Sequence, residues 1–494
     1  MNSRELTQFA LWCILASSLA SCGGGGTSGN AAPAPGAPLL DAAQRTGTER
    51  TSSSAATSTT NALPPLATTS DQTFGLSCSP EFTITAGGYA SCNIKWIEHI
   101  NLRGGESIGG HFVASTHTFF VDNWESGFYA FDTMNPLSPT LDSVLNVDQG
   151  NLPAGVLVSA VENEETAVND KLAFLSRTPT KDVAVIDVSN PKAMSILSTV
   201  SGAFDHTMRC VDDCAFVYGS YDGSTYTGGH VIDATDPRNP KMLSDWSNLH
   251  GGIINVHDTT EIKPGLLATA SNPVTFLDVS NPAAPKYIFS LPTTTEETGP
   301  TGLGPAQKGH VGHSVQWPRQ GRDRWFLGQN EGAYVGLCSQ YPPDGRTLYS
   351  YDTRDWERTH SFKLVGAYEL VNGNGDESVN GGSEEVDSHG SPSTAVLGTP
   401  EGCSAHWFDV NPNFNNGGLA VMSSFAFGAR LLNVAENGQI QQIGWFVPSG
   451  LADTVGVYWI TNRIMYLVDF EAGGIDVIEY TGPLPTSGPL SFKR

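Results

Sequence analysis

Short apolar strands that end in the same kind of turn recur along the chain. In VAVIDVSNPKAM (183–194), alternating apolar and β-branched residues predict a strand. The aspartate at its end can accept hydrogen bonds from nearby backbone N–H groups, and Asn-Pro then fixes a turn. Close copies occur at 128–141, 230–242 and 274–287, and weaker copies occur at 348–356, 429–440 and 473–484.

The residue that ends each of these strands marks the repeat. The seven markers are Asp132, Asp187, Asp233, Asp278, Asp352, Asn433 and Asp476. Successive markers lie 43 to 55 residues apart, except for two gaps of 74 and 81 residues that hold insertions. A period of about 45 residues accommodates four short strands, which form one β-propeller blade. The chain is therefore predicted to be all-β, a seven-bladed β-propeller over residues 75–494, with 93–102 as the outer strand of the last blade. Another all-β repeat fold, such as a solenoid, is the alternative.

The first 22 residues predict an export signal. The apolar run 9–19 is shorter than the roughly 20 residues that span a bilayer, but it suits the core of a signal peptide. It leads into Leu19-Ala20-Ser21-Cys22, which resembles the lipobox of bacterial lipoproteins, where the cysteine is lipidated. Residue 23 is glycine rather than aspartate, as in lipoproteins sent to the outer membrane of Gram-negative bacteria. The alternative is an ordinary secretory peptide that leaves Cys22 unmodified.

Residues 23–74 predict a flexible linker. They are mostly Gly, Ala, Pro, Ser and Thr, and they cannot bury enough apolar surface to offset chain entropy. We therefore expect an exported propeller that is tethered to the membrane through a lipid on Cys22.

Export also affects the expected redox state of the remaining cysteines. The propeller region has six: Cys78, Cys92, Cys210, Cys214, Cys338 and Cys403. An even number in an oxidising compartment predicts disulfides. Proximity along the chain favours Cys78–Cys92 and Cys210–Cys214, which leaves Cys338–Cys403, although six cysteines allow 15 pairings.

The composition of the chain and the absence of familiar catalytic motifs disfavour several classes of function. The chain has 26 Lys and Arg against 50 Asp and Glu, and its net charge of −24 should repel nucleic acid. It contains no GxSxG, HExxH, P-loop, or GxGxxG after a strand. A serine hydrolase, a zincin and a nucleotide-binding enzyme are therefore disfavoured.

The strand-and-turn segments resemble the LVIVD-repeat β-propeller family, in which such strands are followed by Asp and a DVSNP turn. The resemblance covers residues 93–484 and is strongest over 128–292. It implies the propeller fold far more than it implies a function. The architecture and the histidine placement are also similar to selenium-binding proteins, including bacterial methanethiol oxidases, whose copper site uses histidines.

Several histidines precede the markers by comparable lengths of chain. They are His206, His257, His313 and His406, and His111 precedes the first marker in the same way. These positions open a blade, where the first strand lines the central channel, so we expect the four imidazoles to converge at one end of it. Glu162 stands near the matching place in the second repeat.

Imidazoles and carboxylates together can bind a transition metal such as copper or zinc. The alternative is a polar, hydrated channel whose histidines bond to neighbours and water. The acidic insertion at 373–402 has carboxylates that could take calcium, but its spacing fits no known loop, and a solvated loop explains it better.

Two functions follow from the sequence. The first is a binding or scaffold module for a protein or small-molecule ligand, which the sequence does not identify. The second is a metal-dependent oxidase, with copper as one candidate metal, at the histidine-lined channel. A calcium-dependent hydrolase of the propeller type ranks behind both.

Overall fold

The computed structural model describes residues between 82 and 490, with long gaps at 147–164, 292–309, 333–346 and 370–404 and several shorter ones. The predicted signal peptide (1–22), the linker (23–74) and the acidic insertion (373–402) lie outside the described residues. No helix in the described part of the chain is long and apolar enough to cross a membrane.

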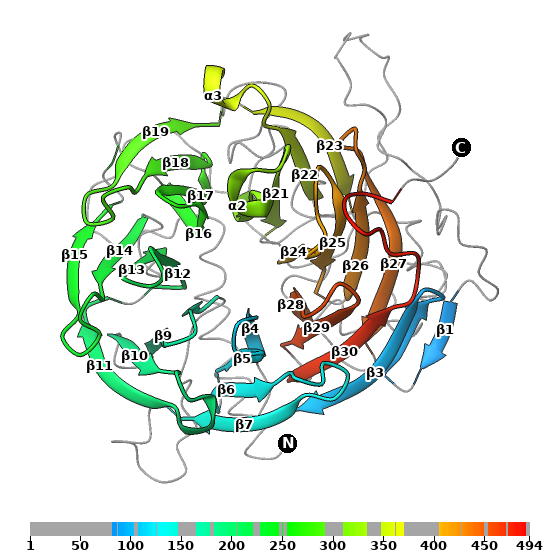
Figure 1. Cartoon of the computed structure of the whole chain (residues 1–494), viewed down its shortest axis with the longest axis horizontal. Helices are drawn as coiled ribbons and strands as arrows, with labels where there is room; N and C mark the ends of the chain where they lie inside the picture. Colours follow the sequence, from blue (N-terminus) through cyan, green and yellow to red (C-terminus); the bar gives the residue numbers. More distant parts are fainter. Residues whose placement is uncertain are drawn as a thin grey trace, which may run out of the picture.

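Seven antiparallel sheets stand around a common centre, which confirms the predicted seven-bladed β-propeller (Figure 1). In five of the seven sheets the first strand in chain order is innermost, and later strands lie progressively further out. The other two sheets also take strands from the start of the described chain, and those strands lie on the outside. Blade 1 consists of β4 (Ser107–Val113), β5 (Thr118–Asn123), β6 (Gly127–Asp132) and β7 (Thr140–Leu145). Blade 2 consists of β8 (Ala167–Val168), β9 (Leu172–Arg177), β10 (Asp182–Asp187) and β11 (Ser195–Ser201). Blade 3 consists of β12 (Thr207–Val211), β13 (Phe216–Ser220), β14 (Gly228–Asp233) and β15 (Lys241–Asp245).

The remaining blades follow the same order, and short helices occupy connections. Blade 4 consists of β16 (Ile254–Lys263), β17 (Leu266–Asn272), β18 (Thr275–Asp278) and β19 (Lys286–Ser290). Blade 5 consists of β20 (His310–Gln316), β21 (Trp325–Gly332), β22 (Thr347–Asp352) and β23 (Lys363–Glu369). Blade 6 contains β24 (Phe408–Val410), β25 (Gly418–Ser423), β26 (Ala429–Val434) and β27 (Ile440–Pro448). The described helices are η2 (Pro191–Ala193), α2 (Pro318–Gly321) and α3 (Trp356–Thr359).

The two ends of the propeller meet in blade 7, which closes the ring. This blade contains β28 (Thr454–Trp459), β29 (Ile464–Asp469) and β30 (Gly474–Tyr480), and its outer strand is β3 (Ile94–Asn101) from the start of the chain. Strands β3 and β30 pair from Ile94 with Tyr480 to Asn101 with Gly474, so the predicted role of 93–102 is confirmed. Before β3, the hairpin of β1 (Phe82–Thr85) and β2 (Gly88–Ser91) extends blade 6 to six strands, which the sequence did not predict.

Most of the marker residues lie where the repeat predicts, whereas Asp476 lies inside its strand, β30. Five markers are the last residue of the third strand of their blade, and Asn433 lies one residue before the end of β26. Asp187, Asp233 and Asp278 each accept a hydrogen bond of 2.9–3.0 Å from the backbone N–H two residues later. The turn is therefore built locally, by a side chain that substitutes for backbone pairing.

The hydrophobic core is divided among the blade interfaces. The described residues form seven clusters, and each cluster joins neighbouring blades. Between blades 4 and 5, for example, Phe276 and Phe289 meet Trp356 and Phe362. Because these clusters bury the inner strands of the sheets, the inner strands are held in fixed positions relative to the next blade.

Of the predicted disulfides, Cys210–Cys214 is present, with a Cα–Cα distance of 4.3 Å. Cys92 is also disulfide-bonded. Cys78, Cys338 and Cys403 lie outside the described residues, so the pairings Cys78–Cys92 and Cys338–Cys403 stay predictions.

Candidate metal centre

Four of the predicted histidines lie side by side on consecutive blades. His206 directly precedes β12, His257 is in β16, His313 is in β20, and His406 precedes β24. Ring centroids are 5.0 Å apart for His206 and His257, 3.9 Å for His257 and His313, and 4.4 Å for His313 and His406. All four side chains are buried. The equivalent positions of successive repeats thus form an arc of imidazoles along the inner strands.

Irregular strand pairing sets the positions of the two central histidines. In β20, Gly312 pairs with Asn330 and Ser314 pairs with Gln329, so His313 is an extra residue between two consecutive partners. The pairing of β16 with β17 also shifts between Ile254 and Asp258, in the stretch that contains His257. A β-bulge of this kind redirects a side chain away from the regular alternation of the strand.

A close approach of two backbones brings blades 4 and 5 together at this point. A Cβ atom on Gly312 would lie 3.1 Å from the carbonyl oxygen and 3.3 Å from the nitrogen of Ser271 in β17. Any larger residue would therefore press on the backbone of the neighbouring blade. Glycine beside His313 lets the inner strands come close enough for the two imidazoles to meet.

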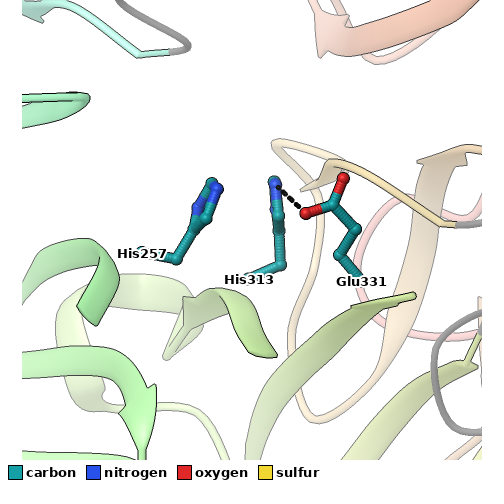
Figure 2. A group of neighbouring side chains, drawn as sticks. All are labelled: His257, His313 and Glu331. Atoms are coloured by element: carbon teal, nitrogen blue, oxygen red, sulfur yellow. Dashed lines mark ion pairs between the residues drawn. The ribbon is translucent and has the colours of Figure 1, made fainter. Parts of the chain in front are cut away.

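Three residues form a buried group that could hold a metal ion: His257, His313 and Glu331 (Figure 2). Their ligand atoms all lie within 4.8 Å of one another, and Nε2 of His313 is 3.6 Å from Oε2 of Glu331. Two ligands of a tetrahedral ion are about 3.4 Å apart, given metal–ligand bonds of about 2.1 Å. The His313–Glu331 pair is close to this separation, and no pair of ligand atoms in the group is more than 4.8 Å apart.

His206 and His406 flank this group without belonging to it. Nδ1 of His406 lies 2.7 Å from the carbonyl oxygen of Val455, to which it donates a hydrogen bond. His406 also packs against Phe425, with a centroid distance of 4.8 Å. These contacts orient the imidazole of His406 and place an apolar ring beside it.

His111 belongs to a different cluster, which is organised by Arg209. This arginine is in β12 and forms ion pairs with Glu165 of blade 2 and Asp258 of blade 4. Its guanidinium lies 5.3 Å from the ring of Trp407 in blade 6, so it reaches across the centre of the propeller. Nδ1 of His111 is 3.7 Å from Oε1 of Glu165. Burial, and then the positive charge of Arg209, lower the pKa of His111 to about 4.

The predicted acidic residue Glu162 cannot be compared with the site, whereas three other carboxylates are described there. Glu162 lies outside the described residues, whereas Glu165, three residues later, contacts His111 and Arg209. Asp258 pairs with Arg209, and burial raises the pKa of this carboxyl even though Arg209 opposes the rise. Trp407 connects the two clusters, because its ring is also 5.8 Å from that of His313.

Sequence reasoning missed Glu331 because it considered only the first strand of each blade. Glu331 lies in β21, the second strand of blade 5, within GQNEG (328–332). The available signal was a carboxylate in a strand that begins with the apolar run 325–327, since charged residues are rarely buried without a partner.

Comparison with known proteins shows the fold alone. No family model matches the chain, and no curated protein matches it. Its structure is similar to the crystal structure of the Myceliophteria thermophila Cps50 (Swd1) β-propeller domain, with a TM-score of 0.50 and 9% identity. The match covers 78% of this chain and 99% of that one. The resemblance to LVIVD-repeat propellers therefore stays a prediction.

Proposed function

We propose that this protein is a binding module that holds one transition-metal ion at His257, His313 and Glu331. The observation that carries the proposal is the convergence of these three buried donors from two adjacent blades. Two imidazoles and a carboxylate suit zinc, copper or iron far better than calcium, which prefers oxygen ligands. Copper and zinc are the ions we expect.

The number of ligands favours a site that also accepts something from outside. Structural zinc sites use four protein ligands, whereas catalytic sites use three and leave a position open. The three donors here follow the second pattern. This pattern supports a second candidate function, that of a metal-dependent enzyme. If the ion is copper, the enzyme would be an oxidase. Bound copper would supply one-electron chemistry, whereas zinc would act only as a Lewis acid.

The protein residues would hold and shield the ion. Glu331 neutralises part of its charge, which burial would otherwise make costly. Phe425 and Trp407 pack against His406 and His313, so they limit the access of water to this side of the group. A site of this kind binds its ion tightly only when the imidazoles are deprotonated, so affinity should fall as pH falls.

Metal analysis of the full-length protein tests the proposal. The chain is purified in detergent, stripped with a chelator, reloaded with copper or zinc, and analysed for metal content. We expect one ion per chain in the wild type, and loss of that ion in His257→Ala and Glu331→Gln. His117→Asn is the matched control, because His117 is exposed and its φ of 52° is one that asparagine tolerates. A wild type without stoichiometric metal, or a His257→Ala variant that retains it, would refute the site.

We also propose that the protein is an exported lipoprotein, anchored to the outer membrane through Cys22. The support is the sequence Leu19-Ala20-Ser21-Cys22, which follows an apolar run too short to span a bilayer. The linker at 23–74 would then let the propeller stand away from the membrane surface.

A further inference from the structure

A buried amide lies beside the candidate metal ligands. Gln329 is in β21, two residues before Glu331, and the residues 329–331 take successive partners in β20, where the extra residue of the bulge lies. Residues two apart in a regular strand point to the same face of a sheet, so the Gln329 and Glu331 side chains share a face. Gln329 is also directly opposite Ser314 in β20, the residue after His313.

Both of these side chains are buried, with exposures of 0% for Gln329 and 1% for Ser314. Within the described residues, Nε2 and Oε1 of Gln329 have no hydrogen-bond partner, and neither has Oγ of Ser314. Buried polar groups are nearly always paired, because an unpaired one keeps the full cost of desolvation. Two unpaired groups at opposing positions of one strand pair therefore call for a ligand that pairs with them.

We propose that Gln329 and Ser314 bind a small oxygen-donor anion, such as a carboxylate, that also occupies the open position of the metal. The inference rests on the metal site proposed above. The amide Nε2–H and the serine O–H donate to the oxygens of the anion, while the metal takes one oxygen directly. A divalent ion with Glu331 as its only anionic ligand keeps one positive charge, which a monoanion would neutralise in this buried place.

The same geometry would also admit an ordered water that merely satisfies the two groups. A water and a functional anion predict different results when the amide is removed. Replacing Gln329 by an apolar residue of similar size deletes an unpaired buried amide, so the metal-free protein should gain stability. Only an anion-binding role predicts that the same change also weakens anion binding by the metal-loaded protein.

The experiment uses full-length protein loaded with Cu(II), and acetate as the probe. Acetate binding is followed by the change in the visible absorption of the copper. We expect Gln329→Leu to retain one ion per chain, to bind acetate about tenfold more weakly, and to melt at a higher temperature than the wild type when metal-free. Ser314→Ala should weaken acetate binding severalfold. Gln329→Met replaces the leucine variant if that protein does not fold.

Gln439→Leu is the matched control, because Nε2 of Gln439 donates a 2.8 Å hydrogen bond to the carbonyl of Val365. This variant should lose thermal stability and keep the acetate affinity of the wild type. If Gln329→Leu binds both copper and acetate like the wild type, the anion site is wrong and the metal site stands. If Gln329→Leu loses stability as Gln439→Leu does, the amide has a structural role and the anion site is also wrong. A wild type that holds no copper overturns both proposals.

Discussion

The indole Nε1 of Trp96 donates a hydrogen bond of 2.8 Å to Oδ1 of Asp476. Trp96 is in β3, at the start of the described chain, and Asp476 is in β30, near its end. The pair therefore joins the two strands that close the propeller. Asp476 is also a marker of the repeat, but in blade 7 it lies inside its strand and contacts a strand from the other end of the chain.

Asp476→Ala should weaken the closure of the ring. The change removes the acceptor of Trp96 and the partner of His99, whose Nδ1 lies 3.4 Å from the same oxygen. We expect the free energy of unfolding to fall by about 1–2 kcal/mol, measured by urea unfolding. Asp187→Ala is the control, because that marker makes only exposed turn contacts. Equal losses in the two variants would show that the contacts of Asp476 with β3 stabilise the protein no more than an exposed turn contact, and would contradict the prediction.

The same contact predicts a dependence on pH. The hydrogen bond to Asp476 raises the pKa of His99 above its usual value of 6.5, although burial opposes the rise. Because protonated His99 is favoured in the folded protein, its contact with Asp476 stabilises the fold fully at pH values below the pKa of histidine in the unfolded chain. This stabilisation is lost as the pH rises through the higher pKa of His99 in the folded protein. His99→Gln should therefore cost most stability near pH 5 and least near pH 9. A difference between wild type and variant that stays constant over this range would contradict the prediction.

Arg209→Met should destabilise the centre of the propeller. It leaves Glu165 and Asp258 without their cation, and these side chains are only 4% and 0% exposed. Removing one partner of a buried ion pair costs about 3–5 kcal/mol. The loss should shrink at low pH, because burial already raises the pKa of Asp258 and protonation removes its uncompensated charge.

Thermal unfolding across pH 4 to 8 measures this effect. Arg354→Met is the control, because Arg354 is 67% exposed and solvent screens its pairing with Asp352, so the change should cost little stability. Arg209→Met and Arg354→Met with the same small loss at neutral pH would disprove a structural role for the Arg209 cluster.

Cys22→Ser should abolish the membrane anchor. A thioether-linked diacylglyceryl group requires the thiol, and firm attachment to a membrane takes at least two acyl chains. We expect the wild type in the membrane fraction with a lipidated N-terminal cysteine, and the variant as an uncleaved or soluble precursor. Mass spectrometry of the mature N-terminus decides the matter. An unmodified N-terminus downstream of residue 22 would refute the lipoprotein proposal.

The sequence alone determined the fold because the information is local and repeated. Alternating apolar residues specify a strand, and Asp187, Asp233 and Asp278 specify the turn that follows through bonds to residues two positions away. A repeat length that fits four strands then leaves few architectures. Residues 93–102 could be placed as the closing strand because the last repeat lacked one.

The sequence also placed His206, His257, His313 and His406 in equivalent positions, since repeated units put equivalent residues on a ring. It could not distinguish them from one another. The structure joins His257 and His313 with Glu331, and leaves His111 with Glu165 and Arg209. Glu331 belongs to a second strand, so no count of residues from the repeat marker would have led to it.

Only the tertiary structure decided which side chains meet, because that depends on distances between blades. The extra residue at His313 turns its ring out of the regular alternation, and Gly312 lets two backbones approach. Both effects depend on how blade 4 packs against blade 5. Strand and turn propensities act over a few residues and can be read from the chain, whereas a shared site depends on the packing of residues that are far apart in sequence.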